Sequence, residues 1–95
     1  MIEGETVSDI AQDVPKGAVE TRFDGGIVAP GLIDLQVNGG GGWMVDGQTD
    51  RARLARICAV HAGLGATGIL PTLITDSYES TQRVIQAGVE AIGTP

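Results

Sequence analysis

The sequence is poor in aromatic residues, in basic residues and in cysteine. Aromatic side chains make up only 3% of its 95 residues, and six Lys and Arg stand against twelve Asp and Glu, giving a formal net charge of -6. An acidic surface repels phosphate backbones and anionic lipids, so neither nucleic acid nor a membrane surface is an expected partner. The single cysteine, Cys58, cannot form an internal disulfide, which fits a reducing cytoplasm.

Long apolar runs are also missing, and we expect no leader segment. No run approaches the roughly 18 residues that span a bilayer. Met1 is followed by acidic residues rather than by a basic and then apolar stretch. We therefore expect a cytoplasmic chain that is not exported. Its length suits one small domain, so any larger architecture would be incomplete here.

The residues that are present describe a globular chain whose pattern changes near Pro30. Hydrophobic residues make up 42% and glycine takes 15 positions, which indicates packed structure with many turns. Before Pro30, short apolar stretches between turn signals predict β-strands at residues 6–10, 19–23 and 27–29. After it, the pattern predicts a strand at 32–38, a helix at 50–64, a strand within 67–75 and a helix at 77–92.

Local signals support these elements. Gly65 is placed to end the first helix in the left-handed conformation. Asp76 is expected to cap the second helix, with Glu79 completing a capping box. Pro71 removes a ladder donor and so indicates a bulge or a late start of the second strand. Each helix carries an apolar stripe, formed in the first by Leu54, Ile57, Cys58, His61 and Leu64 and in the second by Ile85, Val89 and Ile92.

Two successive βα units predict parallel strands joined by right-handed crossovers, with helices covering the sheet. Side chains alternate along a strand, which places Gln36 and Asn38 on the face opposite Val37. In a parallel barrel that face points inward, and the residues near the carboxyl end of a strand stand where such barrels build active sites. A satisfied structural network of amides is an equally good interpretation of the geometry alone.

The four glycines at residues 39–42 permit backbone conformations and close approaches that a Cβ would forbid, although a loose loop is the simpler interpretation. They do not match the dinucleotide-binding G-x-G-x-x-G pattern or a P-loop. Trp43 is expected to be a packing anchor. His61, the one histidine, is expected to serve helix packing or a helix end rather than a metal.

Two separated motifs carry a family resemblance. The string "GGIVAPGLIDLQVNGGGGWMVD", followed after the helix by "GATGILPTLIT", closely resembles the N-acetylglucosamine-6-phosphate deacetylase family of the amidohydrolase superfamily. Many superfamily members carry P-G-x-I-D-x-H-x-H on the first barrel strand, with both histidines binding metal, whereas in this family the pair is often Q-x-N. The positions that match are Gln36, Asn38, Gly39, Gly41 and Gly42, together with residues 71–75 of the second strand. The first five are the residues expected to line the active site.

The resemblance implies an N-terminal fragment of an α/β protein. Residues 30–95 would form the first two βα units of a TIM-type (β/α)8 barrel, preceded at 1–29 by part of a small β-sandwich domain. The family hydrolyses N-acetylglucosamine 6-phosphate to glucosamine 6-phosphate and acetate with a divalent metal, commonly zinc, and we expect the parent to be a homo-oligomer. Its metal ligands and its catalytic aspartate lie at positions that this chain does not include. We therefore expect no metal ligand, no catalytic residue and no activity in the fragment itself.

Two other interpretations remain open. The chain could be a non-catalytic remnant or assembly module that keeps the half-barrel for packing. It could also derive from another amidohydrolase, such as a cyclic-amide hydrolase, although the missing H-x-H pair weighs against this.

Overall fold

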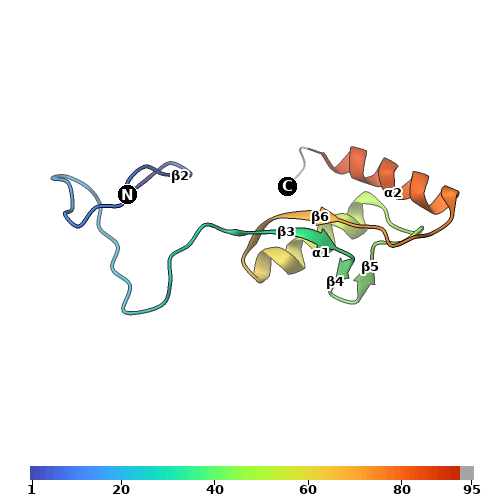
Figure 1. Ribbon diagram of the computed structural model, residues 1–95, viewed down its shortest axis with the longest axis horizontal. Coiled ribbons are helices and arrows are strands. Elements are labelled where there is room, and N and C mark those ends of the chain that lie inside the picture. Colours follow the sequence, from blue (N-terminus) through green and yellow to red (C-terminus); the bar gives the residue numbers. More distant parts are fainter. Residues whose placement is uncertain (93–95) are drawn as a thin grey trace.

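The computed structural model describes residues 1–92 of the 95-residue chain. Its elements in chain order are β1 (Ile2–Glu3), β2 (Thr6–Val7), β3 (Leu32–Val37), β4 (Gly39–Gly40), β5 (Trp43–Met44), α1 (Arg51–Gly63), β6 (Ala66–Pro71) and α2 (Tyr78–Ala91). Elements β3 to α2 pack together, while the chain that precedes β3 extends away from them (Figure 1). The last three positions of the predicted barrel segment 30–95 lie outside the described residues.

The centre of the packed part is a parallel pair of strands. β3 and β6 run in the same direction, with Ile33 opposite Gly68 and Val37 opposite Pro71, and α1 makes the crossover between them (Figure 1). The register shifts between Asp34 and Val37, where the partner strand reaches Pro71. Proline has no N–H to give to the ladder. Of the two predictions from Pro71, a bulge or a late strand start, this register shift fits the bulge.

The predicted order of strand, helix, strand and helix after Pro30 is confirmed, with ends that differ by a few residues. Asn38 lies just beyond β3, and the second strand ends at Pro71 instead of continuing toward residue 75. Two parallel strands with a crossover helix are common to open sheets and barrels. The partial (β/α)8 barrel therefore stays a prediction.

Side chains and glycine set the helix ends. Asp50 caps α1, where its Oδ1 accepts a hydrogen bond from the Arg53 amide at 2.7 Å, and Gly65 follows the helix with a φ of +94° as predicted. The prediction of Asp76 as the cap of α2 is wrong. Ser77 is the cap, and its Oγ accepts from the Ser80 amide at 3.1 Å.

This shift by one position also removes the predicted capping box. With Ser77 as the cap, Glu79 occupies the second helical position rather than the third, from which a side chain reaches back to the cap. Asp76 instead accepts a hydrogen bond from the Ser77 amide at 2.6 Å. Neither helix within residues 1–92 is both long and apolar enough to cross a membrane.

The core lies between β3 and α1. Its buried members are Val37, Val45 and Ile57, and Ile69, Leu73 and Val84 pack against them. α2 joins this core through Val84 and Ala87. The apolar stripe predicted on α2, Ile85, Val89 and Ile92, is exposed, so no other part of residues 1–92 covers it.

The region before Pro30 is less regular than predicted. β1 and β2 form a short antiparallel pair across Gly4, whereas residues 19–23 and 27–29 form no strand. A strand needs a neighbour for its N–H and C=O groups, and residues 1–92 supply none to these stretches. Val19 and Ile27 are accordingly 96% and 93% exposed. The β-sandwich segment at 1–29 stays a prediction.

A short loop at residues 45–50 connects β5 to α1 and is closely hydrogen-bonded. The backbone N–H of Asp46 donates to Thr49 Oγ1 at 2.9 Å. In return, the backbone N–H of Thr49 donates to the Asp46 carbonyl at 2.9 Å. Asp46 Oδ1 also accepts from the Gln48 amide at 2.8 Å and from Arg53 Nη1 at 2.6 Å. The Asp46 carboxylate thus ties the loop to the first turn of α1.

The exposed apolar side chains predict self-association of the 95-residue chain. β3 and β6 form a two-stranded sheet, so each strand has one unpaired edge, and Leu35 of β3 is 71% exposed. Leu35→Lys should weaken association severalfold in sedimentation velocity over a concentration series. Ile10→Lys, which changes a 92% exposed residue outside the sheet, should not. A chain that stays monomeric at every concentration would contradict this expectation.

Asp46→Asn should lower the free energy of unfolding by about 1 kcal/mol, because the Arg53 side chain is only 14% exposed and loses its carboxylate partner. The matched control is Glu20→Gln, whose partner Arg22 is 84% exposed. That change should cost less than roughly 0.5 kcal/mol. Urea unfolding followed by the fluorescence of Trp43 measures both, and equal effects would show that burial of the pair is irrelevant.

Candidate functional site

The candidate site lies where β3 ends. Val37 is buried in the core, and Asn38 follows it half-buried. Asn38 Nδ2 donates a hydrogen bond to the Thr72 carbonyl at 3.0 Å, and the Thr72 amide donates to the Val37 carbonyl at 2.8 Å. These two bonds join the carboxyl ends of β3 and β6 and fix the orientation of the Asn38 amide.

Gln36 has a different environment from Asn38, although alternation predicts a common face. Gln36 is exposed, and its backbone N–H donates to Asp34 Oδ1 at 3.0 Å. The register shift between Asp34 and Val37 spans Gln36. Alternation along an ideal strand therefore does not fix its direction relative to Asn38. The structure brings Asn38 into the network at the strand end and leaves Gln36 outside it.

The glycine run forms a tight β-hairpin, here called the glycine hairpin (residues 39–44). β4 pairs with β5, and the turn residues Gly41 and Gly42 have φ of +60° and +85°. Positive φ at both central residues is typical of a type I′ turn, for which glycine is the favoured residue. A Cβ on Gly39 would overlap the Trp43 carbonyl oxygen. The close-approach interpretation is confirmed, and the loose loop is wrong.

The glycine hairpin lies against one side of α1. A Cβ added to Gly41 would come 2.8 Å from Val60 Cγ2, and one on Gly40 would come 3.0 Å from His61 Nε2. The guanidinium carbons of Arg53 and Arg56 lie 5.0 and 5.3 Å from the centre of the Trp43 ring. These distances suit cation–π stacking against α1. Trp43 is nevertheless 40% exposed and outside the buried core, so the predicted packing anchor is a contact at the surface.

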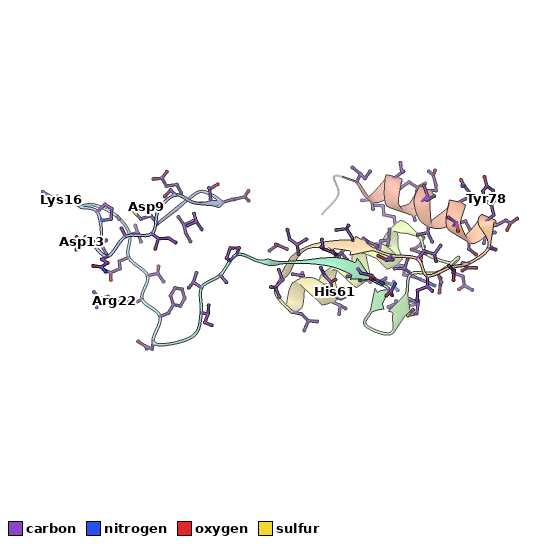
Figure 2. All side chains as sticks on the ribbon, viewed as in Figure 1. Asp9, Asp13, Lys16, Arg22, His61 and Tyr78 are labelled. Carbon is purple, nitrogen blue, oxygen red and sulfur yellow. The ribbon has the colours of Figure 1, made fainter. Side chains whose placement is uncertain are left out.

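His61 makes the most specific contact of this group. Its Nε2 lies 3.0 Å from the Gly39 carbonyl oxygen, a pair of groups 22 positions apart in sequence. Figure 2 shows His61 beside the point where β3 passes into β4. The expected packing or helix-end role is confirmed, since His61 lies in the last turn of α1 and contacts the glycine hairpin. Its partner, the Gly39 carbonyl, could not be predicted, because the position of the glycine hairpin on α1 had to be known first.

The arrangement offers hydrogen bonding rather than acid–base chemistry. Asn38 Oδ1 receives no hydrogen bond from residues 1–92, and the second Nδ2 hydrogen is also available. Across that same range no three His, Cys, Asp or Glu residues lie close enough to hold a metal ion. These residues therefore do not fit a metal centre by themselves. The expectation that the metal ligands and catalytic residues lie elsewhere in the parent stays a prediction.

Five residues were predicted to line an active site. Asn38 and Gly39 follow the end of β3, Gly41 and Gly42 form the turn against α1, and Gln36 lies exposed within β3. Sequence reasoning gave Thr72 no role beyond its place in the matching residues 71–75 and expected only packing or a helix end from His61. These two residues hold Asn38 and Gly39 in place. A signal for Thr72 existed, since it follows Pro71 at the end of the neighbouring parallel strand.

Comparison with known proteins identifies two relatives. The chain is 41% identical over 71 residues to the N-acetylgalactosamine-6-phosphate deacetylase of Shewanella sp. (strain ANA-3). The aligned residues cover 75% of this chain and 18% of that protein. It is 31% identical over 91 residues to the N-acetylglucosamine-6-phosphate deacetylase of Haemophilus influenzae, covering 90% of this chain and 23% of that protein. No protein-family model matches, and no solved structure gives a significant match.

The chain thus spans about a fifth of the length of the curated relatives it matches. Both relatives are named as deacetylases of N-acetylated amino-sugar phosphates, and they differ in the sugar. The family resemblance drawn from the two motifs is therefore confirmed: this chain is related to a part of the amino-sugar-6-phosphate deacetylases.

Proposed function

We propose that these residues are a segment of a hydrolase that removes the acetyl group from an N-acetylated amino-sugar 6-phosphate, with N-acetylglucosamine 6-phosphate as the expected substrate. The observation that carries the proposal is the similarity of most of the chain to two such deacetylases. The sugar is the finer part of the proposal. The relative with the higher identity, 41%, is named for the galactosamine substrate, so both sugars must be tested.

Asn38 is the residue of this segment that we assign to the active site. Deacetylation requires water to attack the amide carbonyl and the amine to leave. A neutral carboxamide neither takes up nor releases a proton at working pH, which excludes Asn38 as base or nucleophile. Its free Oδ1 can accept a hydrogen bond from water or a substrate N–H or hydroxyl. Thr72 holds it in one orientation for that purpose.

A divalent metal, zinc by resemblance to the family, would polarise the acetyl group in the complete enzyme. We assign its ligands to parts of the parent outside this chain. Gln36 and Asn38 are poor candidates for ligands, because imidazole and anionic groups bind zinc better than a neutral amide oxygen does. The segment on this proposal contributes orientation and shape, and it is inactive alone.

A chimera tests the proposal. The matching segment of the Shewanella relative is replaced by the aligned residues of this chain, and acetate release is measured with N-acetylglucosamine 6-phosphate and N-acetylgalactosamine 6-phosphate. We expect activity within about tenfold of the unmodified relative, because the Q-x-N and P-T-L-I-T motifs are intact. The isolated 95-residue chain with added zinc is the control and should release none. A folded but inactive chimera would favour the remnant or assembly module.

Asn38→Ala in that chimera should lower kcat by about 10- to 100-fold, the usual cost of losing a group that orients the reacting partners. Metal content should stay unchanged, since a carboxamide at this position is not expected to be a ligand. Elemental analysis and kinetics on the same samples measure both. Gln36→Ala, at an exposed position outside the strand-end network, is the comparison and should have a smaller effect. Unchanged turnover in Asn38→Ala would leave the amide a purely structural role.

A further inference from the structure

The glycines that directly follow Asn38 make the backbone of the glycine hairpin intrinsically flexible. Ordering one residue costs roughly 1–2 kcal/mol of backbone entropy, and glycine loses more than any other residue. Four consecutive glycines follow Asn38. Without restraints the chain after Asn38 would sample many directions, and the amide that Thr72 orients would move with it.

Three kinds of contact restrain these glycines. The first is the pairing of β4 with β5, which the bond from the Val45 amide to the Asn38 carbonyl extends at 2.8 Å. The second is apolar contact with α1 at Val60. The third is the bond between His61 Nε2 and the Gly39 carbonyl at 3.0 Å. Within residues 1–92 it is the one side-chain hydrogen bond to the backbone of the glycine hairpin.

The chemistry of this bond defines the state of His61. A carbonyl oxygen only accepts, so Nε2 carries the proton, either in the neutral Nε2–H tautomer or in the imidazolium form. The ring edge also fits closely against the chain. A Cβ on Gly40 would lie 3.0 Å from Nε2 and 3.3 Å from Cδ2, so a side chain at residue 40 would press on the edge of the imidazole that reaches Gly39.

We propose that His61 is a positioning residue for Asn38. It holds the Gly39 carbonyl from α1, while Thr72 holds the Asn38 amide from the end of β6. The backbone and the side chain of Asn38 are thereby fixed by two different elements, and Oδ1 points in one direction. The role of His61 in holding the hairpin stands on the contacts alone, and its effect on turnover rests on the proposed function.

Amide hydrogen exchange in the 95-residue chain tests the hairpin contact. His61→Leu should raise the exchange rate of the Val45 amide, which binds the Asn38 carbonyl, by about tenfold, the scale of one lost hydrogen bond. His61→Gln keeps an N–H donor and should restore most of the protection. Ala62→Leu changes an exposed residue in the same turn and should leave the rate unchanged. The ¹⁵N shifts of the imidazole should show a protonated Nε2.

Two glycine variants test the same contact from the other side. Gly40→Ala should increase exchange at Val45 much as His61→Leu does, because its methyl group pushes against the imidazole. Gly42→Asn places a side chain at a positive φ but away from the imidazole, so it should raise exchange less than Gly40→Ala does. Gly42 has a φ of +85° with nothing near its Cβ position, and asparagine tolerates positive φ better than other side chains. If His61→Leu and Gly40→Ala both leave the Val45 amide protected, the proposal is overturned. If one variant folds poorly, the other still decides.

Kinetics in the active chimera test the positioning role. His61→Leu should lower kcat about tenfold with little change in KM, and His61→Gln should recover most of the loss. If His61→Leu raises exchange of the Val45 amide but leaves kcat unchanged, the positioning role is overturned and the contact is purely structural. If the unsubstituted chimera is inactive while the exchange results hold, the proposed function fails and the holding of the hairpin by His61 stands.

Discussion

The parallel pairing of β3 with β6 is the interaction on which the rest of the structure depends. Two parallel strands cannot be joined by a tight turn, so α1 must cross over them and return the chain to the same end of the sheet. The crossover places Ile57 over Val37 and buries both. It also brings Asn38 and Thr72, the residues that follow the two strands, within hydrogen-bond distance. The core and the candidate site are therefore consequences of one pairing.

The same crossover gives α1 a second use. Leu54 and Ile57 are buried on its core side. Its neighbouring side receives the glycine hairpin, with Arg53 and Arg56 over Trp43 and with His61 at the Gly39 carbonyl. Glycine at residues 39–42 has no side chain to pack, so the hairpin depends on α1 for its position. A sequence that looks like a flexible loop thus becomes a fixed element.

The order of the elements after Pro30 could be predicted because each signal is local. Apolar periodicity, the left-handed Gly65 and the missing donor of Pro71 act within a few residues of their own positions. The contacts of the hairpin with α1 could not be predicted, because they depend on tertiary packing. Its turn had a local signal in the two central glycines, which the loose-loop interpretation did not use. The strands at 19–23 and 27–29 failed for a related reason, since a strand exists only beside a partner. Asn38 was found from its place at a strand end, whereas its holders Thr72 and His61 come from other elements.

Gln36 and Asn38 belong to one motif, yet the structure treats them differently. Burying an amide without a partner costs roughly 1–3 kcal/mol. Asn38 is half-buried and meets that requirement through Thr72. Gln36 is exposed, so water can satisfy its amide and no protein partner is needed. An element that covered Gln36 would have to supply a hydrogen-bond partner for its amide. Ile33 and Leu35 alternate with Gln36 along β3, and they would gain from an apolar cover on their own face. The two faces of β3 therefore favour neighbours of different chemistry.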